Sequence, residues 1–363
     1  MPSLFDPLQL GAIHLPNRIL MAPLTRGRAT REGVPTAMMG DYYAQRAAAG
    51  LIISEATGIS RQGLGWPFAP GLWSAEQVEG WKPLVAAVHA AGGRIVAQLW
   101  HMGRLVHPDF LRGDEPVSAS AGTAPFKAHT YDGKKPYGAA RALSVAEIAG
   151  VVEDYARAAR NAVAAGFDGV QVHGANGSLV DQFLRDASNL REDGYGGSVS
   201  NRLRFMSEVV RAVSGAVGAD RTGIRLSPNA VSYGVEDSDP AALFTAAAAE
   251  LARIGVPWIE LREPGPQSTF APSVVAAISP AMRAVFACKI VLNSDYDGLS
   301  GAARMVEGAA DAISFGRTFL ANPDLVNRIR VGAPLNDWDA TTFYTQGHEG
   351  YTDYKTLAEQ EAA

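Results

Sequence analysis

The stretch Gly169-Val-Gln-Val-His-Gly-Ala-Asn-Gly-Ser178 shows the unit from which the chain is built. Its two valines are typical of a buried parallel strand, which ends where His173 introduces a polar side chain. The glycines that follow let the backbone come close to a ligand, so His173 and Asn176 offer two hydrogen-bond donors at one strand end. Short apolar runs that end in this way recur along the chain and decide its fold.

These runs alternate with helical patterns. The expected strands are 18–22, 51–56, 94–100, 169–173, 222–227, 258–262, 289–293 and 312–316. The expected helices are 35–49, 74–91, 144–165, 201–217, 240–253, 272–286, 299–307 and 323–331. About eight such units predict a parallel sheet closed into a (β/α)8 TIM barrel. An open doubly wound sheet is the alternative, which the lack of Gly-x-Gly-x-x-Gly after the first strand disfavours.

Two segments lie outside this repeat. Residues 4–15 alternate around Pro7 and Gly11, which indicates an N-terminal hairpin. Residues 101–141, after the third strand, are rich in Gly, Pro, Ser and Asp and show little periodicity. A long segment of this kind inside a compact domain is typically functional, and we expect a capping insertion without regular structure. We expect residues 1–363 to form one domain.

Composition excludes several classes of protein. The net charge of −5 gives no basic patch for nucleic acid. The single cysteine, Cys288, allows neither an intrachain disulfide nor a cysteine-ligated iron–sulfur cluster. No apolar run approaches the length of a membrane span, and the N-terminus lacks the features of a signal peptide. We therefore expect a cytoplasmic protein, a monomer or homodimer, with no membrane or nucleic-acid partner.

In a TIM barrel the chemistry lies at the carboxyl ends of the strands. Those ends carry few carboxylates and no lysine, which disfavours a Schiff-base aldolase, and they lack the clustered histidines of a zinc site. At the last strand Gly316 and Arg317 suit a phosphate, whereas Gln98 and Arg225 can hydrogen-bond an amide-like heterocycle. These residues together suggest FMN and no metal.

The chain resembles the old yellow enzyme family of FMN-dependent ene-reductases, in the bacterial branch near N-ethylmaleimide and nitrate-ester reductases. The resemblance covers nearly the whole chain and rests on motifs that occur in the family's order. The matching stretches are 21–28, 98–104, 168–177, 181–189, 195–202, 315–324 and 349–354.

This resemblance implies a role for each matching residue. The flavin ring is expected to contact Pro23, Leu24, Thr25, Ala56, Gln98 and Arg225, with the Thr25 hydroxyl tuning its potential. The phosphate region is expected to include Asn293, Ser294, Asp295, Gly316 and Arg317. The substrate pocket is expected to be lined by Trp66, Trp100 and Tyr344. His173 and Asn176 would bind the activating oxygen of an alkene that receives a hydride from FMN N5 at its β-carbon. NAD(P)H would be the reductant, with possible phosphate contacts from His129, Tyr131 and Lys134.

Ser178 departs from the family, which places a proton-donating tyrosine two residues after the asparagine. A serine hydroxyl is far less acidic than a tyrosine. Three explanations are open: water donates the proton, another hydroxyl such as that of Tyr344 substitutes, or protonation is slow and the enzyme favours substrates whose product anion is protonated in solution, such as nitro compounds or quinones. The resemblance implies activated alkenes as substrates, namely unsaturated ketones, aldehydes, maleimides and nitroalkenes. A reductase of nitro compounds, nitrate esters or quinones is the alternative. A flavin-binding redox protein with little ene-reductase turnover is the further alternative.

Overall fold

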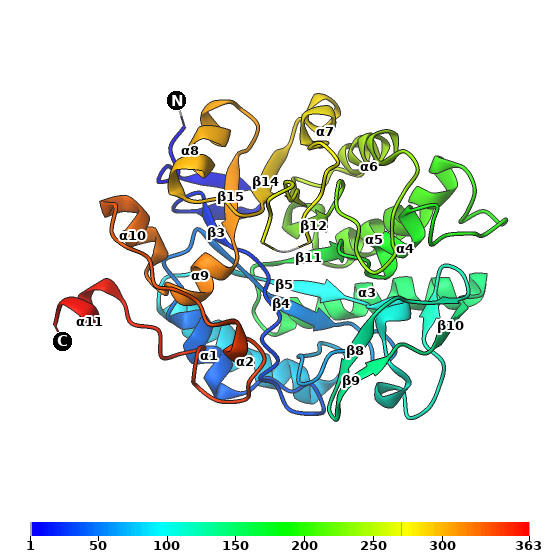
Figure 1. Cartoon of the computed structure of the whole chain (residues 1–363), viewed down its shortest axis with the longest axis horizontal. Coiled ribbons are helices and arrows are strands. Elements are labelled where there is room, and N and C mark those ends of the chain that lie inside the picture. Colours follow the sequence, from blue (N-terminus) through cyan, green and yellow to red (C-terminus); the bar gives the residue numbers. More distant parts are fainter. Residues whose placement is uncertain (1, 270, 363) are drawn as a thin grey trace.

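The centre of the computed structural model, which describes residues 2–269 and 271–362, is a closed barrel of eight parallel strands (Figure 1). Each strand pairs in parallel with its neighbours, and β15 closes the barrel by pairing with β3. The strands are β3 (Ile19–Met21), β4 (Leu51–Gly58), β5 (Ile95–Trp100), β11 (Gly169–Gly174), β12 (Thr222–Leu226), β13 (Trp258–Arg262), β14 (Lys289–Asn293) and β15 (Ala312–Phe315). The predicted TIM barrel is confirmed.

Helices surround the barrel and bury their apolar faces against it (Figure 1). They are α1 (Ala37–Ala44), α2 (Ala75–Ala90), α3 (Val145–Ala164), α4 (Leu179–Leu184), α5 (Val199–Val217), α6 (Pro240–Ile254), α7 (Ser279–Val285), α8 (Gly298–Val306), α9 (Arg317–Ala321) and α10 (Leu325–Val331). Helix α3 begins with the capping box that Ser144 and Glu147 predict.

The prediction of one helix over 272–286 is wrong in its first half, because α7 begins only at Ser279. Pro280 lies in the first turn of α7, and inside a longer helix it would remove a hydrogen bond and clash with the preceding turn. Helix α1 is also shorter than predicted. Beyond Ala44 the chain continues in i,i+3 turns, with Arg46 N–H bound to the Tyr43 carbonyl.

The N-terminal hairpin, β1 (Leu8–Leu10) and β2 (Ile13–Leu15), closes the amino end of the barrel. Its apolar residues form one buried cluster with residues of the barrel strands, including Leu51 and Trp258. The turn is fastened by a hydrogen bond from Ala12 N–H to the Asp220 carbonyl. The hairpin therefore covers the amino end of the barrel, opposite the carboxyl ends of the strands.

The insertion after β5 contains more regular structure than predicted. It forms a three-stranded sheet of β6 (Val117–Ser118), β10 (Ala139–Ala142) and β7 (Gly122–Thr123), and a hairpin of β8 (Lys127–Thr130) and β9 (Gly133–Pro136). These strands are two to four residues long, too short to give a hydrophobic period in the sequence. Figure 1 shows β8, β9 and β10 on one side of the barrel, away from α6, α7 and α8.

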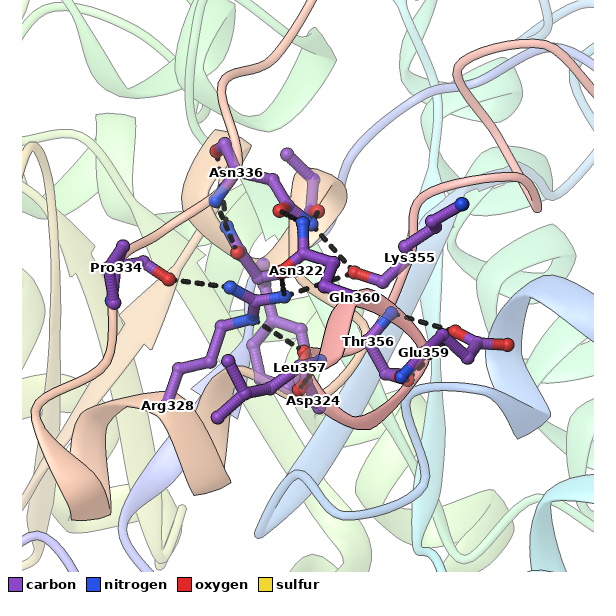
Figure 2. Close-up of polar contacts among 12 residues, drawn as sticks. Asn322, Asp324, Arg328, Pro334, Asn336, Lys355, Thr356, Leu357, Glu359 and Gln360 are labelled. Carbon is purple, nitrogen blue, oxygen red and sulfur yellow. Dashed lines mark hydrogen bonds and ion pairs between the residues drawn. The ribbon is translucent and has the colours of Figure 1, made fainter. Parts of the chain in front are cut away.

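The C-terminal segment crosses the open end of the barrel and is fastened by buried arginines. Arg328 donates to the carbonyls of Pro334, at 2.5 Å, and Lys355, at 3.1 Å, and pairs with Asp324 at 2.8 Å (Figure 2). One guanidinium thus ties both ends of the segment 334–355 to α10, next to the terminal helix α11 (Leu357–Glu361).

The loop after β3 holds the middle of the same segment. Arg26 donates to the Gly350 carbonyl at 2.7 Å, and Arg28 donates to the Phe343 carbonyl at 3.0 Å. These contacts fix the aromatic residues of the segment over the barrel. Within the residues that the structure describes, no helix is both long and apolar enough to cross a membrane.

Candidate active site

A cavity of about 720 Å³ opens at the carboxyl ends of the barrel strands. Its walls come from the loops after the strands, from the insertion and from the C-terminal segment. All of the residues to which the sequence gives a catalytic, cofactor or substrate role line it: Pro23, Leu24, Thr25, Ala56, Trp66, Gln98, Trp100, His173, Asn176, Ser178, Arg225, Asn293, Ser294, Asp295, Gly316, Arg317 and Tyr344. His129 lines it as well, whereas Tyr131 and Lys134 do not.

His173, near the end of β11, is a neutral hydrogen-bonding group. Burial and the positive charge of Arg225 lower the pKa of its imidazole to about 3. Its Nδ1 atom is buried and has no hydrogen-bond partner among the described residues. A buried nitrogen of this kind lowers its energy by binding a ligand in the cavity.

Asn176 follows in the left-handed conformation, with φ of 55°. Its backbone N–H donates to the Ser227 hydroxyl at 2.9 Å, which fixes the turn. Arg262 Nη1 lies 3.4 Å from the Asn176 side-chain oxygen. Because the guanidinium can only donate, it orients the amide so that the NH2 group is left for a ligand.

Ser178 is buried at the start of α4, and its hydroxyl donates to the His173 carbonyl at 2.9 Å. A hydroxyl has a single proton to donate, and this one is committed to the backbone. In this arrangement Ser178 has no proton directed at a ligand.

A chain of buried polar groups lies below the cavity, inside the barrel. Gln98 donates to Gln171 at 2.7 Å, and Gln171 donates to Glu260 at 2.9 Å. Glu260 also accepts from the Ser314 hydroxyl at 2.6 Å. The chain fixes the Gln98 amide with its NH2 group downward, so its carbonyl oxygen is available to a donor in the cavity.

Arg225 is the cation nearest to this chain. It donates to the Asn293 side chain at 2.7 Å, and its Nη1 atom lies 3.4 Å from Glu260, an ion-pair contact rather than a hydrogen bond. Its Nε and Nη1 atoms are buried without a hydrogen-bond partner among the described residues. Burial lowers the pKa of Arg225 from its usual value, so a ligand that accepts hydrogen bonds here would offset a desolvation cost.

Hydroxyl and carboxylate groups surround the far end of the cavity. Arg317 donates to the Thr269 hydroxyl at 2.7 Å and lies 5.1 Å from the Trp338 ring centroid. Asp295 accepts from Thr269 at 2.5 Å. The side chain of Asp295 is thus occupied by neighbouring hydroxyls, while Gly316 leaves space beside Arg317.

Aromatic rings form the outer wall. Trp66 stacks on His129 with ring centroids 4.5 Å apart, and Tyr344 lies 5.0 Å from Trp66. Trp100 lies 6.0 Å from His173 on the inner side. A flat apolar molecule would fit between these rings and the polar floor.

The cavity fits FMN on these grounds. It supplies a fixed amide at Gln98, unpaired nitrogens on Arg225 for an electron-rich ring edge, and Arg317 with Gly316 for a phosphate. The described residues contain no cluster of three or more His, Cys, Asp or Glu that could hold a metal ion.

Sequence reasoning misses several wall residues. Tyr233, Thr269, Trp338 and Phe343 line the cavity from loops that carry no periodic pattern. For these residues the sequence offers only a weak signal, which is the pair Tyr233-Gly234 a few residues beyond the end of β12.

Three comparisons place these features among known proteins. Residues 3–336 match the model of the NADH:flavin oxidoreductase / NADH oxidase family. The structure is similar to that of the old yellow enzyme homologue from Zymomonas mobilis, with a TM-score of 0.97 and 53% identity over 98% of this chain and 100% of that one. It is also similar to morphinone reductase in complex with tetrahydroNAD, with a TM-score of 0.92 and 45% identity over 98% of each chain. The sequence is 40% identical to 12-oxophytodienoate reductase 2 of Arabidopsis thaliana over 98% of this chain and 96% of that protein.

Proposed function

The chain belongs to the NADH:flavin oxidoreductase / NADH oxidase family and, within it, to the old yellow enzymes of the bacterial type. From this membership we propose that it reduces activated carbon–carbon double bonds. It is an NAD(P)H-dependent flavin enzyme of the ene-reductase kind. Its proposed substrates are alkenes activated by a ketone, aldehyde, maleimide or nitro group. Bound FMN supplies hydride transfer, from NAD(P)H and then to the β-carbon of the alkene.

The observation that carries this proposal is the pair of hydrogen-bond donors at the end of β11, His173 and Asn176, which we call the donor pair. His173 is neutral, with an unpaired buried nitrogen, and Asn176 has its amide oriented by Arg262. Negative charge grows on the activating oxygen as the β-carbon receives hydride. Two fixed donors aimed at that oxygen stabilise this charge without reorganisation, which lowers the barrier.

The other residues are proposed to bind and orient. Gln98 and Arg225 hold the ring edge of the cofactor, Thr25 tunes its potential, and Arg317 with Gly316 holds its phosphate. Pro23, Leu24 and Ala56 pack on the ring, and Asn293, Ser294 and Asp295 complete the phosphate end. Trp66, Trp100 and Tyr344 enclose the substrate and exclude water.

A second candidate is the reduction of nitro compounds, nitrate esters or quinones. The bond from Ser178 to the His173 carbonyl favours it, because the family's proton donor has no equivalent at this position. Such acceptors form oxygen anions that water protonates readily, so they need no acid beside a carbon atom.

Stopped-flow measurement of the oxidative half-reaction tests the proposal. Enzyme reduced with NADPH or NADH is mixed with 2-cyclohexenone, N-ethylmaleimide, a nitroalkene or benzoquinone. We expect the first three to reoxidise it far faster than they reoxidise free reduced FMN. Reoxidation by benzoquinone alone would support the second candidate, and no acceleration by any acceptor would indicate a redox protein without this turnover.

The double variant His173→Ala/Asn176→Ala separates the donor pair from the rest of the cavity. It should keep bound FMN and its reduction by NAD(P)H but lose alkene reoxidation by about 10²-fold or more. His14→Gln is the matched control, because His14 is exposed on the hairpin at the opposite end of the barrel.

A further inference from the structure

Tyr233 occupies an unusual position in the loop after β12. It lies in a tight turn that is closed by a hydrogen bond from Val235 N–H to the Ser232 carbonyl at 2.9 Å. Tyr233 has φ of 53° and Gly234 has φ of 69°. The left-handed region is unfavourable for a bulky aromatic residue, so contacts around the turn must hold it there.

The capping insertion supplies those contacts. Arg104 donates to the Tyr233 carbonyl at 3.0 Å, and the rings of Tyr137 and Phe126 lie 6.2 and 6.3 Å from the Tyr233 ring. Pro125 packs against Gly234, where a Cβ atom would lie 3.3 Å away. Residues of the insertion therefore hold the turn in this conformation.

On its other side the turn packs against the strand end that carries the donor pair. A Cβ atom at Gly177 would lie 2.9 Å from the Ser232 carbonyl oxygen and 3.6 Å from Tyr233 Cδ2. Gly177 stands between Asn176 and Ser178, and Tyr233 lines the same cavity as both. The Tyr233 ring thus lies beside Gly177, one residue before the position at which the family carries its tyrosine.

We propose that the Tyr233 hydroxyl delivers the proton to the α-carbon of the alkene, a role for which Ser178 is not placed. This inference rests on the proposed function. As hydride adds to the β-carbon, the electron pair of the double bond moves toward the α-carbon and the oxygen held by His173 and Asn176. The O–H bond of Tyr233 then breaks as the new α-carbon–hydrogen bond forms, and water returns a proton to the phenolate.

The chemistry of the group suits this step. Burial raises the pKa of Tyr233, so its hydroxyl keeps its proton at neutral pH. The described residues provide no hydrogen-bond partner for that hydroxyl, unlike the hydroxyl of Ser178. A carbanion or enolate is a much stronger base than a phenolate, so the transfer is downhill.

Single-turnover reduction of 2-methyl-2-cyclohexenone in D2O tests the inference through two readouts, the rate of flavin reoxidation and the configuration of the deuterated α-carbon. In Tyr233→Phe we expect the rate to fall about 10²-fold and the product to lose its α-configuration. Reoxidation by benzoquinone should be unchanged in the same variant, because it needs no proton at carbon.

Tyr137→Phe is the control, since Tyr137 packs on Tyr233 and does not line the cavity. It should keep both the rate and the α-configuration. If Tyr233→Phe keeps both the rate and the α-configuration, water is the proton donor and the inference is overturned. If the variant loses as much rate with benzoquinone as with the enone, Tyr233 has only a structural role and the inference is overturned as well. Failure of the wild-type enzyme to react with the enone would instead overturn the proposed function itself.

Discussion

The Ser178 hydroxyl donates its proton to the backbone carbonyl of His173, at 2.9 Å, within the same strand end that carries the donor pair. Ser178 therefore binds the main chain of His173 and not its imidazole ring. The bond makes Ser178 part of the support for the β11 end.

Ser178→Ala should consequently leave alkene reduction within about twofold of wild type. Loss of one buried hydrogen bond should lower the free energy of unfolding by about 1 kcal/mol. Stopped-flow kinetics and urea denaturation measure the two effects. Ser198→Ala is the matched control, because Ser198 caps α5 and should cost about 1 kcal/mol as well. A tenfold loss of alkene reduction in Ser178→Ala alone would make Ser178 the acid.

Arg225→Lys should weaken FMN binding and lower the midpoint potential of the bound flavin. Lysine has a single nitrogen on a shorter side chain, so it cannot combine the bond to Asn293 with the two further N–H donors of Arg225, and its positive charge would lie farther from the reduced flavin. Fluorescence titration with FMN and potentiometry provide the measurements. Arg221→Lys, an exposed arginine just before the same strand, should change neither; an equal effect of both variants would place the cause outside the cavity.

Arg328→Lys should loosen the C-terminal segment that carries Tyr344. The single ammonium nitrogen of lysine cannot reach both carbonyls, so that of Pro334 or Lys355 loses its partner, which we expect to cost about 2 kcal/mol. Hydrogen exchange over 334–355 and the KM for the alkene should both increase. Arg330 on the same helix is exposed, so Arg330→Lys should have no effect. Equal hydrogen exchange over 334–355 in the two variants would contradict the role of Arg328 in holding the segment.

His101 makes stability depend on pH. Burial lowers the pKa of its imidazole to about 3, against 6.5 in the unfolded chain. As the pH falls below 6.5, the unfolded chain binds a proton that the folded protein does not, so stability is lost by about 1.4 kcal/mol per pH unit.

His101→Asn removes this dependence while keeping an acceptor for the Gly103 N–H, which binds His101 Nδ1 at 3.0 Å. Between pH 7.5 and 5 the wild type should therefore lose about 2 kcal/mol more than the variant in urea denaturation at fixed FMN concentration. A difference between the two proteins that stays constant with pH would contradict the shift.

The site residues could be found from sequence because barrel geometry brings the carboxyl ends of all strands to one face. His173, Gln98, Arg225 and Arg317 each end or follow an apolar strand, so reading the strand ends was enough to gather them. Their roles toward FMN and substrate remain predictions. The predicted helix over 272–286 is wrong in its first half because Pro280 lies in the first turn of α7, where its ring suits the start of a helix rather than the interior.

The order of short apolar strands thus determined the barrel, its open end and the strand-end residues of the cavity wall, since these follow from local hydrophobic period and chain connectivity. Only the tertiary structure decided the direction of the Ser178 hydroxyl, the contact of Arg262 with Asn176 and the approach of Tyr233 to Gly177. The contacts of Arg262, Tyr233 and Arg328 join residues that are distant in sequence. Tyr233 also lies in a loop that shows no hydrophobic period. Such contacts arise only once the barrel has brought distant segments together.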